Sequence, residues 1–252
     1  MQLESTLTKP LRILVIAAHP DDIEFGAGGS VIRWTDAGAE VTYCLVTNGA
    51  AGSNEKEVNL NDLIKRREEE QKAAAEIAGV HDVRFLGYQD GILEPSIALR
   101  RDLTRLIREL RPDRVVINDP TFTLIQDDKF SYINHPDHIA AATAALYAVF
   151  PSAETRPIFP ELLDEGLEPH HVDELFLMFT DKPNWAIDVT SARDRKIQAL
   201  LCHRSQLNEE SIEFVDQFDK EAGKQVGVEL AEMFRVMRFV DEAVAAKDDP
   251  AD

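Results

Sequence analysis

The sequence predicts an α/β protein with a Rossmann-like, doubly wound and mostly parallel sheet, arranged in three layers as α/β/α. Apolar runs of strand length alternate with helix-like segments, which is the order that builds a parallel sheet. At 252 residues the chain is long enough to bury one large hydrophobic core. We therefore expect a single domain over residues 1–252, with a core at about 11–207, a C-terminal helical extension at 208–242 and a frayed tail at 243–252.

The first half of the chain shows this alternation most clearly. Residues 11–18 (LRILVIAA) form an unbroken apolar run, as expected for a strand that helices cover on both faces. Residues 63–78 carry Arg and Glu densely on one side and alanines on the other, and Gly79 is a typical end of a helix. The expected elements of this half are, in order, strand 11–18, helix 28–37, strand 41–47, loop 48–59, helix 63–78, strand 83–86, helix 96–110 and strand 114–118.

The second half begins with a long connection, residues 119–134, that has no clear periodicity. Connections of this length inside compact domains are usually functional or disordered. Residues 151–173 are rich in Pro, Glu and Gly, which predicts an irregular excursion over the surface. The remaining expected elements are helix 135–149, strands 174–180 and 186–189, and helix 191–203.

The amino-acid composition limits the kinds of molecule that this protein is expected to bind. The chain has 27 Lys and Arg residues against 46 Asp and Glu residues, for a formal charge of −19, and such a surface repels nucleic-acid phosphates and anionic lipid. No apolar run is long enough to cross a bilayer or to form a signal-peptide core. We therefore expect a cytoplasmic protein without nucleic-acid or membrane partners. Cys44 and Cys202 lie in separate apolar stretches and are expected to be buried free thiols.

Two His-Pro-Asp clusters contain the candidate metal-binding and catalytic residues. His19-Pro20-Asp21-Asp22 follows the first strand directly, and His135-Pro136-Asp137-His138 comes at the end of the long connection after the fourth strand. In doubly wound sheets, ligands bind beyond the carboxyl ends of the strands where strand order reverses, and strands one and four usually flank that point. The topology therefore predicts that both clusters lie at one crevice, although they are far apart in the sequence.

The spacing within these clusters suits a metal ion. His19 and Asp22 are three residues apart across a turn, and His138 at the start of a helix can reach the same centre from the other side. Two imidazoles and one carboxylate leave a fourth tetrahedral position for water, as catalytic zinc requires, although the same triad also suits iron(II). Either cluster alone is explained as a helix cap. Two such clusters on facing loops of one crevice favour a metal site.

The same residues resemble the LmbE-like, or PIG-L, N-deacetylases. That family has an apolar strand running into Ala-His-Pro-Asp-Asp and a later His-Pro-Asp-His, and both motifs stand here without departure at residues 18–22 and 135–138. The resemblance covers roughly residues 11–207, and one small departure is Ala78-Gly79, where the family commonly has Leu-Gly. Further matching segments are Thr47-Asn48-Gly49, Arg66-x-x-Glu69, Asp90-Gly91 and the closing helix at 196–206, which ends His203-Arg204-Ser205-Gln206.

The resemblance implies a role for each matching position of this chain. The implied roles are His19, Asp22 and His138 as ligands of one zinc ion per chain, Asp21 as general base, His135 as the histidine that stabilises the oxyanion, Asp137 as the residue that orients or charges this histidine, and Arg66 as a substrate contact. From the spacing of residues alone, Arg66 is expected to be a charged side chain on the solvent-facing side of a helix.

The predicted function is therefore a zinc-dependent hydrolase that removes an N-acetyl group from a small amino-sugar conjugate. The sequence leaves open which divalent metal is physiological, which aglycone the substrate carries and whether the chain forms a homo-oligomer. A non-haem iron(II) enzyme on the same triad is an alternative, but Asp21 is a spare carboxylate of the kind that hydrolysis needs. A Rossmann-like ligand-binding module, with both clusters structural, is the non-enzymatic alternative.

Overall fold

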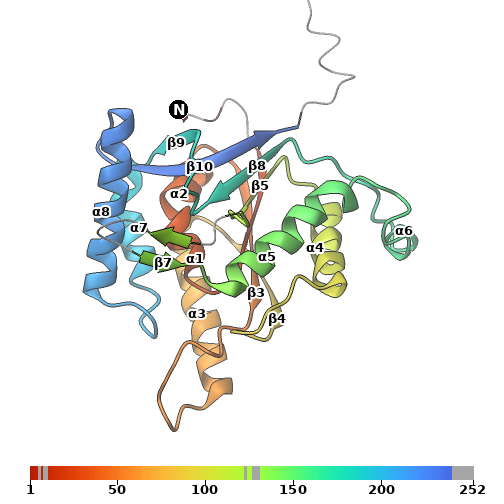
Figure 1. Ribbon diagram of the computed structural model, residues 1–252, viewed down its shortest axis with the longest axis horizontal. Coiled ribbons are helices and arrows are strands. Elements are labelled where there is room, and N and C mark those ends of the chain that lie inside the picture. The colour runs from red at the N-terminus through yellow and green to blue at the C-terminus, as the bar shows by residue number, and fades with distance from the viewer. Residues whose placement is uncertain (5–6, 8–10, 122–123, 127–130, 240–252) are drawn as a thin grey trace, which may run out of the picture.

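The computed structural model describes residues 1–4, 7, 11–121, 124–126 and 131–239. Within these ranges, eight strands form one sheet in the order β1-β9-β10-β8-β5-β2-β3-β4, and helices lie on both of its faces (Figure 1). The strands are β1 (Gln2–Glu4), β2 (Arg12–Ala17), β3 (Glu40–Thr47), β4 (Asp82–Tyr88), β5 (Arg114–Asn118), β8 (Glu174–Met178), β9 (Trp185–Asp188) and β10 (Ala231–Arg238).

The helices follow the predicted order, with two short additions. The helices α1 and α6 are the additions, and the full series is α1 (Asp22–Gly26), α2 (Gly28–Asp36), α3 (Leu60–Ala78), α4 (Ile97–Leu110), α5 (Pro136–Tyr147), α6 (Glu161–Asp164), α7 (Arg193–Leu200) and α8 (Glu209–Val226). Short helical turns also form at Ala148–Ser152 and Thr190–Ala192.

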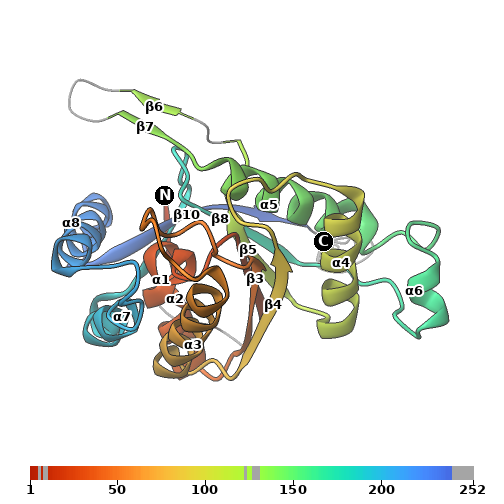
Figure 2. The same ribbon diagram turned by 90° about the horizontal axis from the view of Figure 1, so that it is seen from below.

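Strand order reverses at β2, as a doubly wound sheet requires. β2 pairs in parallel with β3 on one side and with β5 on the other. Alternate side chains of β2 enter two separate cores, because Ile13 and Val15 pack with α1, α2 and α3, whereas Leu14 and Ile16 pack with α4 and α5. Figure 2 shows these two groups of helices on opposite faces of the sheet. The predicted three-layer architecture is confirmed.

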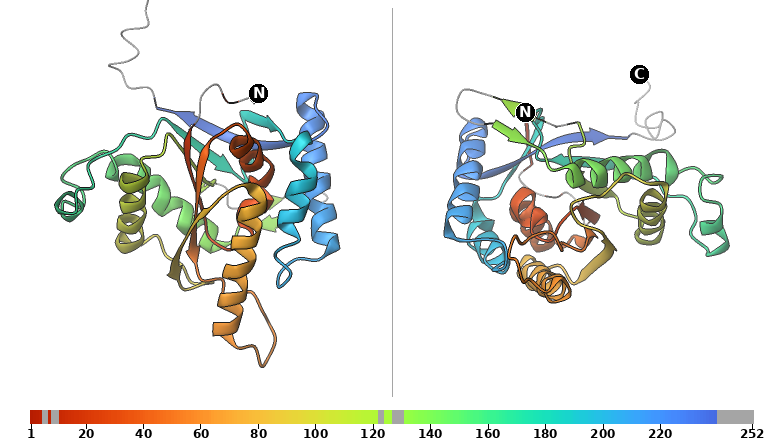
Figure 3. Two further views of the ribbon diagram at one scale, coloured as in Figure 1. Left: turned by 180° about the vertical axis from the view of Figure 1, so that it is seen from behind. Right: turned by 60° about the horizontal axis from the view of Figure 1, so that its bottom comes forward.

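The C-terminal extension is only partly helical. The helix expected at 208–242 is confirmed for α8, which lies beside α7 (Figure 3). It is wrong for Ala231–Arg238, which form β10, inserted antiparallel between β8 and β9. Phe234 and Val236 are buried while Arg235 between them is partly exposed. This period-two burial fits a strand rather than a helix.

Two other segments form strands that no pattern in the sequence predicts. Within the connection at 119–134, Leu124–Gln126 (β6) and Ser131–Ile133 (β7) form an antiparallel hairpin that projects from the body of the molecule (Figure 2). Near the N-terminus, β1 pairs in parallel with β9. The tail predicted at 243–252 lies outside the described residues.

Two expectations from composition can be compared with the structure. None of the helices in the described ranges combines the length and the apolar character that crossing a membrane needs. Cys44 is a buried free thiol, as predicted. Cys202 is also free but only partly buried, so the prediction of burial is wrong for this residue. Cys202 lies two residues after the end of α7 at Leu200, beside the exposed Leu201.

Candidate metal centre

The two His-Pro-Asp clusters meet at the carboxyl end of β2. His19 follows this strand, Asp22 begins α1, and His138 lies in the first turn of α5. Ligand atoms of these three residues all lie within 4.8 Å of one another. Asp22 lies between the two imidazoles, with Oδ1 at 3.1 Å from His138 Nε2 and Oδ2 at 3.5 Å from His19 Nδ1. The geometry thus brings together the three residues that the sequence singles out as ligands.

The outer nitrogen of each imidazole is held by a side-chain oxygen. His19 Nε2 lies 3.0 Å from Asp90 Oδ1 and 3.3 Å from Asp137 Oδ2. His138 Nδ1 lies 3.2 Å from Asn134 Oδ1. When these nitrogens donate to the oxygens, the lone pairs of His19 Nδ1 and His138 Nε2 face Asp22. Metal-ligating histidines are typically fixed in this way, because the outer hydrogen bond sets the tautomer and the ring orientation.

Three carboxylates surround the imidazole of His19 at the centre. Burial disfavours protonation of His19, but the surrounding carboxylates of Asp22, Asp137 and Asp90 outweigh it and raise the His19 pKa to about 12. Burial likewise opposes ionisation of Asp22, yet His138 and His19 hold its pKa well below the usual range. A cation held here would balance the charge of these carboxylates, and two imidazoles with one carboxylate are a ligand set that fits zinc.

A second group of possible ligands consists of His19, His135 and Asp137. The Asp137 carboxylate is already engaged, because it accepts hydrogen bonds from the backbone N–H groups of Gly91 at 2.7 Å and Leu93 at 3.0 Å in addition to its contact with His19. It therefore fixes His19 and the chain at 91–93. Among the described residues no hydrogen bond joins the Asp137 carboxylate to His135, although its charge acts to raise the His135 pKa, so the role of Asp137 toward His135 stays a prediction.

His135 is the N-cap of α5. Its Nδ1 accepts a hydrogen bond from the backbone N–H of Asp137 at 3.2 Å, so it is the Asp137 main chain, not its carboxylate, that fixes this ring. Burial, followed by the charges of His19 and His138, lowers the His135 pKa below its usual value. The ring lies edge-on to His19 with 4.7 Å between the ring centroids. His135 is thus a neutral imidazole whose Nε2–H is the donor available at the centre.

Asp21 lies beside the centre in a strained backbone conformation. Its φ of 105° is rare for a residue with a side chain and costs on the order of 1–3 kcal/mol. Its N–H donates to Gln71 Oε1 at 3.0 Å, and its Oδ2 lies 3.3 Å from Arg67 Nη2. Burial raises the Asp21 pKa to about 6, although Arg67 acts in the opposite direction. Strained residues that the surroundings hold in place are common at active sites.

The arginine beside the centre is Arg67 rather than Arg66. Arg66 is exposed on α3, and among the described residues no hydrogen bond or ion pair joins it to the clusters. Arg67 is buried and donates from Nη2 to Pro20 O at 2.6 Å and from Nη1 to Gly49 O at 2.9 Å. The helical period explains the difference, because Arg67 shares the inward face of α3 with Ala74 and Ala78, whereas Arg66 does not.

Asp90 is the other neighbour that the sequence does not assign to the centre. It follows β4, and its second oxygen accepts from the N–H of Ala51 at 2.8 Å.

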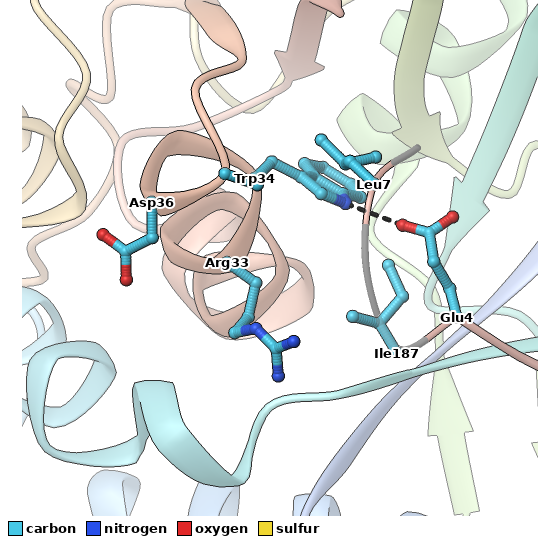
Figure 4. A pocket seen from close by; sticks show the side chains of 7 residues that line it. Glu4, Leu7, Arg33, Trp34, Asp36 and Ile187 are labelled. Atoms are coloured by element: carbon cyan, nitrogen blue, oxygen red, sulfur yellow. Dashed lines mark hydrogen bonds between the residues drawn. The ribbon is translucent and has the colours of Figure 1, made fainter. Parts of the chain in front are cut away.

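A cavity of about 210 Å³ lies elsewhere, between α2, β1 and β9, where Trp34 Nε1 donates to Glu4 at 3.1 Å (Figure 4). The described residues that line this cavity include none from the two clusters, so the centre is a separate site.

Known proteins are similar to this chain in fold and in the part of the sequence that contains the two His-Pro-Asp clusters. The family model described as PIG-L, GlcNAc-PI de-N-acetylase, matches residues 14–149, which include both clusters. The solved structure of N,N'-diacetylchitobiose deacetylase from Pyrococcus horikoshii has a TM-score of 0.83 at 31% identity, covering 90% of this chain and 84% of that chain.

Two curated proteins that are named as deacetylases are similar to this chain in sequence. The diacetylchitobiose deacetylase of Thermococcus kodakarensis is 34% identical over 200 residues, covering 79% of this chain and 71% of that protein. The probable N-acetyl-α-D-glucosaminyl L-malate deacetylase 2 of Bacillus cereus is 30% identical over 201 residues, covering 77% of this chain and 83% of that protein. The chain therefore belongs to the PIG-L, or GlcNAc-PI de-N-acetylase, family.

Proposed function

We propose that this protein is a zinc-dependent N-deacetylase of small N-acetylated amino-sugar conjugates. The observation that carries the proposal is the convergence of His19, Asp22 and His138 on one centre, with the Asp21 carboxylate beside it. Two relatives of this chain are named as deacetylases of N-acetylated amino sugars, which supports the same class of substrate.

The ligands in this proposal are His19, Asp22 and His138. A zinc ion held by them would lower the pKa of a water molecule toward neutrality and polarise the amide carbonyl. Asp21 is the base that accepts a proton from the attacking water, because it is an ionisable carboxylate beside the ligands that hydrogen bonds of the chain fix in place. The same carboxyl group then returns the proton to the departing amine.

His135 acts as a neutral hydrogen-bond donor. Its Nδ1 is occupied by the N-cap hydrogen bond, so its Nε2–H is free to donate to the oxygen that becomes negative when the amide carbon turns tetrahedral. One well-placed donor of this kind contributes about 2.7–4 kcal/mol to stabilisation of the transition state. This assignment keeps the oxyanion role that the resemblance implies for His135, with a neutral ring rather than one charged by Asp137.

The direct test is a screen of N-acetylated amino sugars, including diacetylchitobiose and the N-acetylglucosaminyl conjugates of malate and inositol. Acetate and the free amine are both measured, first with zinc added and then after chelation. We expect equal amounts of the two products, formed only with the metal. Products that form equally well after chelation would overturn the zinc-dependent mechanism, and iron rather than zinc in the active protein would overturn the metal assignment.

Replacing His135 by Ala should lower kcat by about a hundredfold to a thousandfold while KM changes little, because the donor engages only as charge develops on the substrate. Since the His135 pKa is lowered, this ring is already neutral at neutral pH. The wild-type rate should therefore show no alkaline decline that depends on His135. A decline present in the wild type and absent from His135→Ala would show that the ring acts as a cation.

Removal of the metal should stop turnover but leave the fold intact. Two apolar cores on opposite faces of the sheet exist independently of the centre. The raised pKa also means that His19 takes up a proton and balances the carboxylates when the ion leaves, a contribution to stability that is full below pH 6.5 and is lost progressively as pH rises to about 12. Thermal unfolding of the apo and reconstituted forms at neutral pH measures this, and an apo chain without a cooperative transition would contradict it.

A further inference from the structure

One peptide group next to the metal centre is held at both of its polar atoms. Arg67 Nη2 donates to Pro20 O at 2.6 Å, and the N–H of Asp21 donates to Gln71 Oε1 at 3.0 Å. The carbonyl and the N–H belong to the same peptide, which joins Pro20 to Asp21. Arg67 and Gln71 are four residues apart on α3, so their side chains extend from one face of that helix.

Gln71 is itself oriented by a buried carboxylate. Its Nε2 donates to both oxygens of Glu24, at 3.1 and 3.2 Å. Because a carboxylate only accepts hydrogen bonds, the amide nitrogen of Gln71 must face Glu24, and the amide oxygen is left to accept from Asp21. His203 Nε2 lies 3.0 Å from Glu24 Oε2 and holds the carboxylate from its other side.

Burying this network of polar groups costs free energy, so a contribution to the stability of the fold does not by itself explain the network. Glu24 and Gln71 are 0% exposed and His203 is 1% exposed. Apolar side chains of the same volume would fill the space without the desolvation cost of these groups. A fully paired polar network instead fixes one arrangement of the groups it touches. The group at its end is the strained backbone of Asp21, with φ at 105°.

We propose that Gln71, oriented by Glu24 and His203, is a positioning residue that holds the Pro20–Asp21 peptide and thereby aims the Asp21 carboxylate at the reacting water. This inference rests on the proposed function, because it takes Asp21 as the general base. Loss of the hydrogen bond to Gln71 frees the Asp21 peptide at one end, and the carboxylate then samples orientations that do not reach the proton.

The first test is Gln71→Met, which keeps the length of the side chain and removes its hydrogen bonds to Asp21 and to Glu24. We expect kcat to fall by about a hundredfold, the usual effect of misplacing a reacting group by about 1 Å, with KM changed by less than about threefold. Metal content should stay at the wild-type level, because Gln71 contacts none of the three ligands. Wild-type kcat, or loss of the metal together with kcat, would overturn the proposal.

The decisive measurement is the same change in the Asp21→Asn background. If Gln71 acts through Asp21, Gln71→Met should have almost no further effect on kcat once the base is absent, since two residues that act as a unit are not additive. Equal losses of kcat in the two backgrounds would show that Gln71 matters only for the fold. Normal turnover in Asp21→Asn alone would reject the proposed function itself, whereas an impaired Asp21→Asn with a normal Gln71→Met rejects only the positioning role.

Ser205→Ala is a matched control. Ser205 donates from Oγ to Glu70 Oε2 at 2.6 Å, so this variant removes a side-chain hydrogen bond between the same helix and the chain that follows α7. It leaves Gln71 and Asp21 untouched. We expect a lower Tm with kcat unchanged, and a loss of kcat as large as that of Gln71→Met would overturn the assignment.

Glu24→Gln tests the same proposal if Gln71→Met does not fold. An amide at position 24 can donate as well as accept, so it no longer dictates which way the Gln71 amide faces. We expect a partial loss of kcat, about tenfold, that disappears in the Asp21→Asn background. A loss of the same size in both backgrounds would again overturn the positioning role.

Discussion

Asp21→Asn should lower the turnover number by about a hundredfold to ten-thousandfold, the usual contribution of a positioned general base, while the metal content stays near one ion per chain. Asn keeps the shape of the side chain and tolerates positive φ better than most residues, so the strained backbone at 105° should persist. Only the proton acceptor is lost. Elemental analysis and steady-state kinetics on the same preparation measure both parts of this prediction.

Asp21→Gly provides a second comparison. Gly adopts a φ of 105° without steric cost, so this variant should unfold at a temperature close to that of the wild type although it lacks the base. A large loss of kcat without loss of stability would separate the catalytic role of the side chain from any structural one. Near-normal kcat in both variants would remove Asp21 as the base.

His138→Ala should empty the metal centre and abolish turnover, because two remaining protein ligands do not hold a divalent ion as three do. His19→Ala should do the same and should also lower the Tm more strongly. Its imidazole is the partner of three buried carboxylates, those of Asp22, Asp90 and Asp137. Removing it leaves them with neither a proton donor nor a metal ion to balance them.

His81→Ala is the control for these variants. His81 is a surface histidine paired with Glu76, with 74% of its side chain exposed, so its removal should change neither metal content nor kcat. Metal bound per chain, measured after dialysis against a weak chelator, distinguishes the variants. A wild-type metal content in His138→Ala would contradict the assigned ligand set.

The sequence predicts the parts of this protein whose signal is local. The apolar run before His19 identifies β2, and the order of strands and helices places the reversal of the sheet beside it. The first His-Pro-Asp cluster then follows β2, and the second opens α5 at the end of the long connection after β5. Arg67 could also have been found, because counting back from Ala78 in helical steps reaches Ala74, Gln71 and Arg67 on the buried face.

Other features depend on contacts that no local pattern records. Asp90 is a single acidic residue in a loop, and only the folded chain shows that it lies 3.0 Å from His19. Asp137 lies two residues after His135 in the sequence, yet its carboxylate contacts His19 and the N–H groups of Gly91 and Leu93. The strand β10 follows a long helix, and its place between β8 and β9 comes from tertiary pairing.

The insertion of β10 has a consequence for folding during synthesis. β8 and β9 leave the ribosome well before residues 231–238, so for that interval the nascent chain carries two strands whose facing edges have no partner. Unpaired edges of this kind recruit other chains and are where growing polypeptides aggregate or engage chaperones. The residues of the metal centre all precede residue 140, so they have been synthesised while the facing edges of β8 and β9 still lack β10. Because β10 can pair with β8 and β9 only after residues 231–238 have been synthesised, closure of this part of the sheet is a late, long-range step.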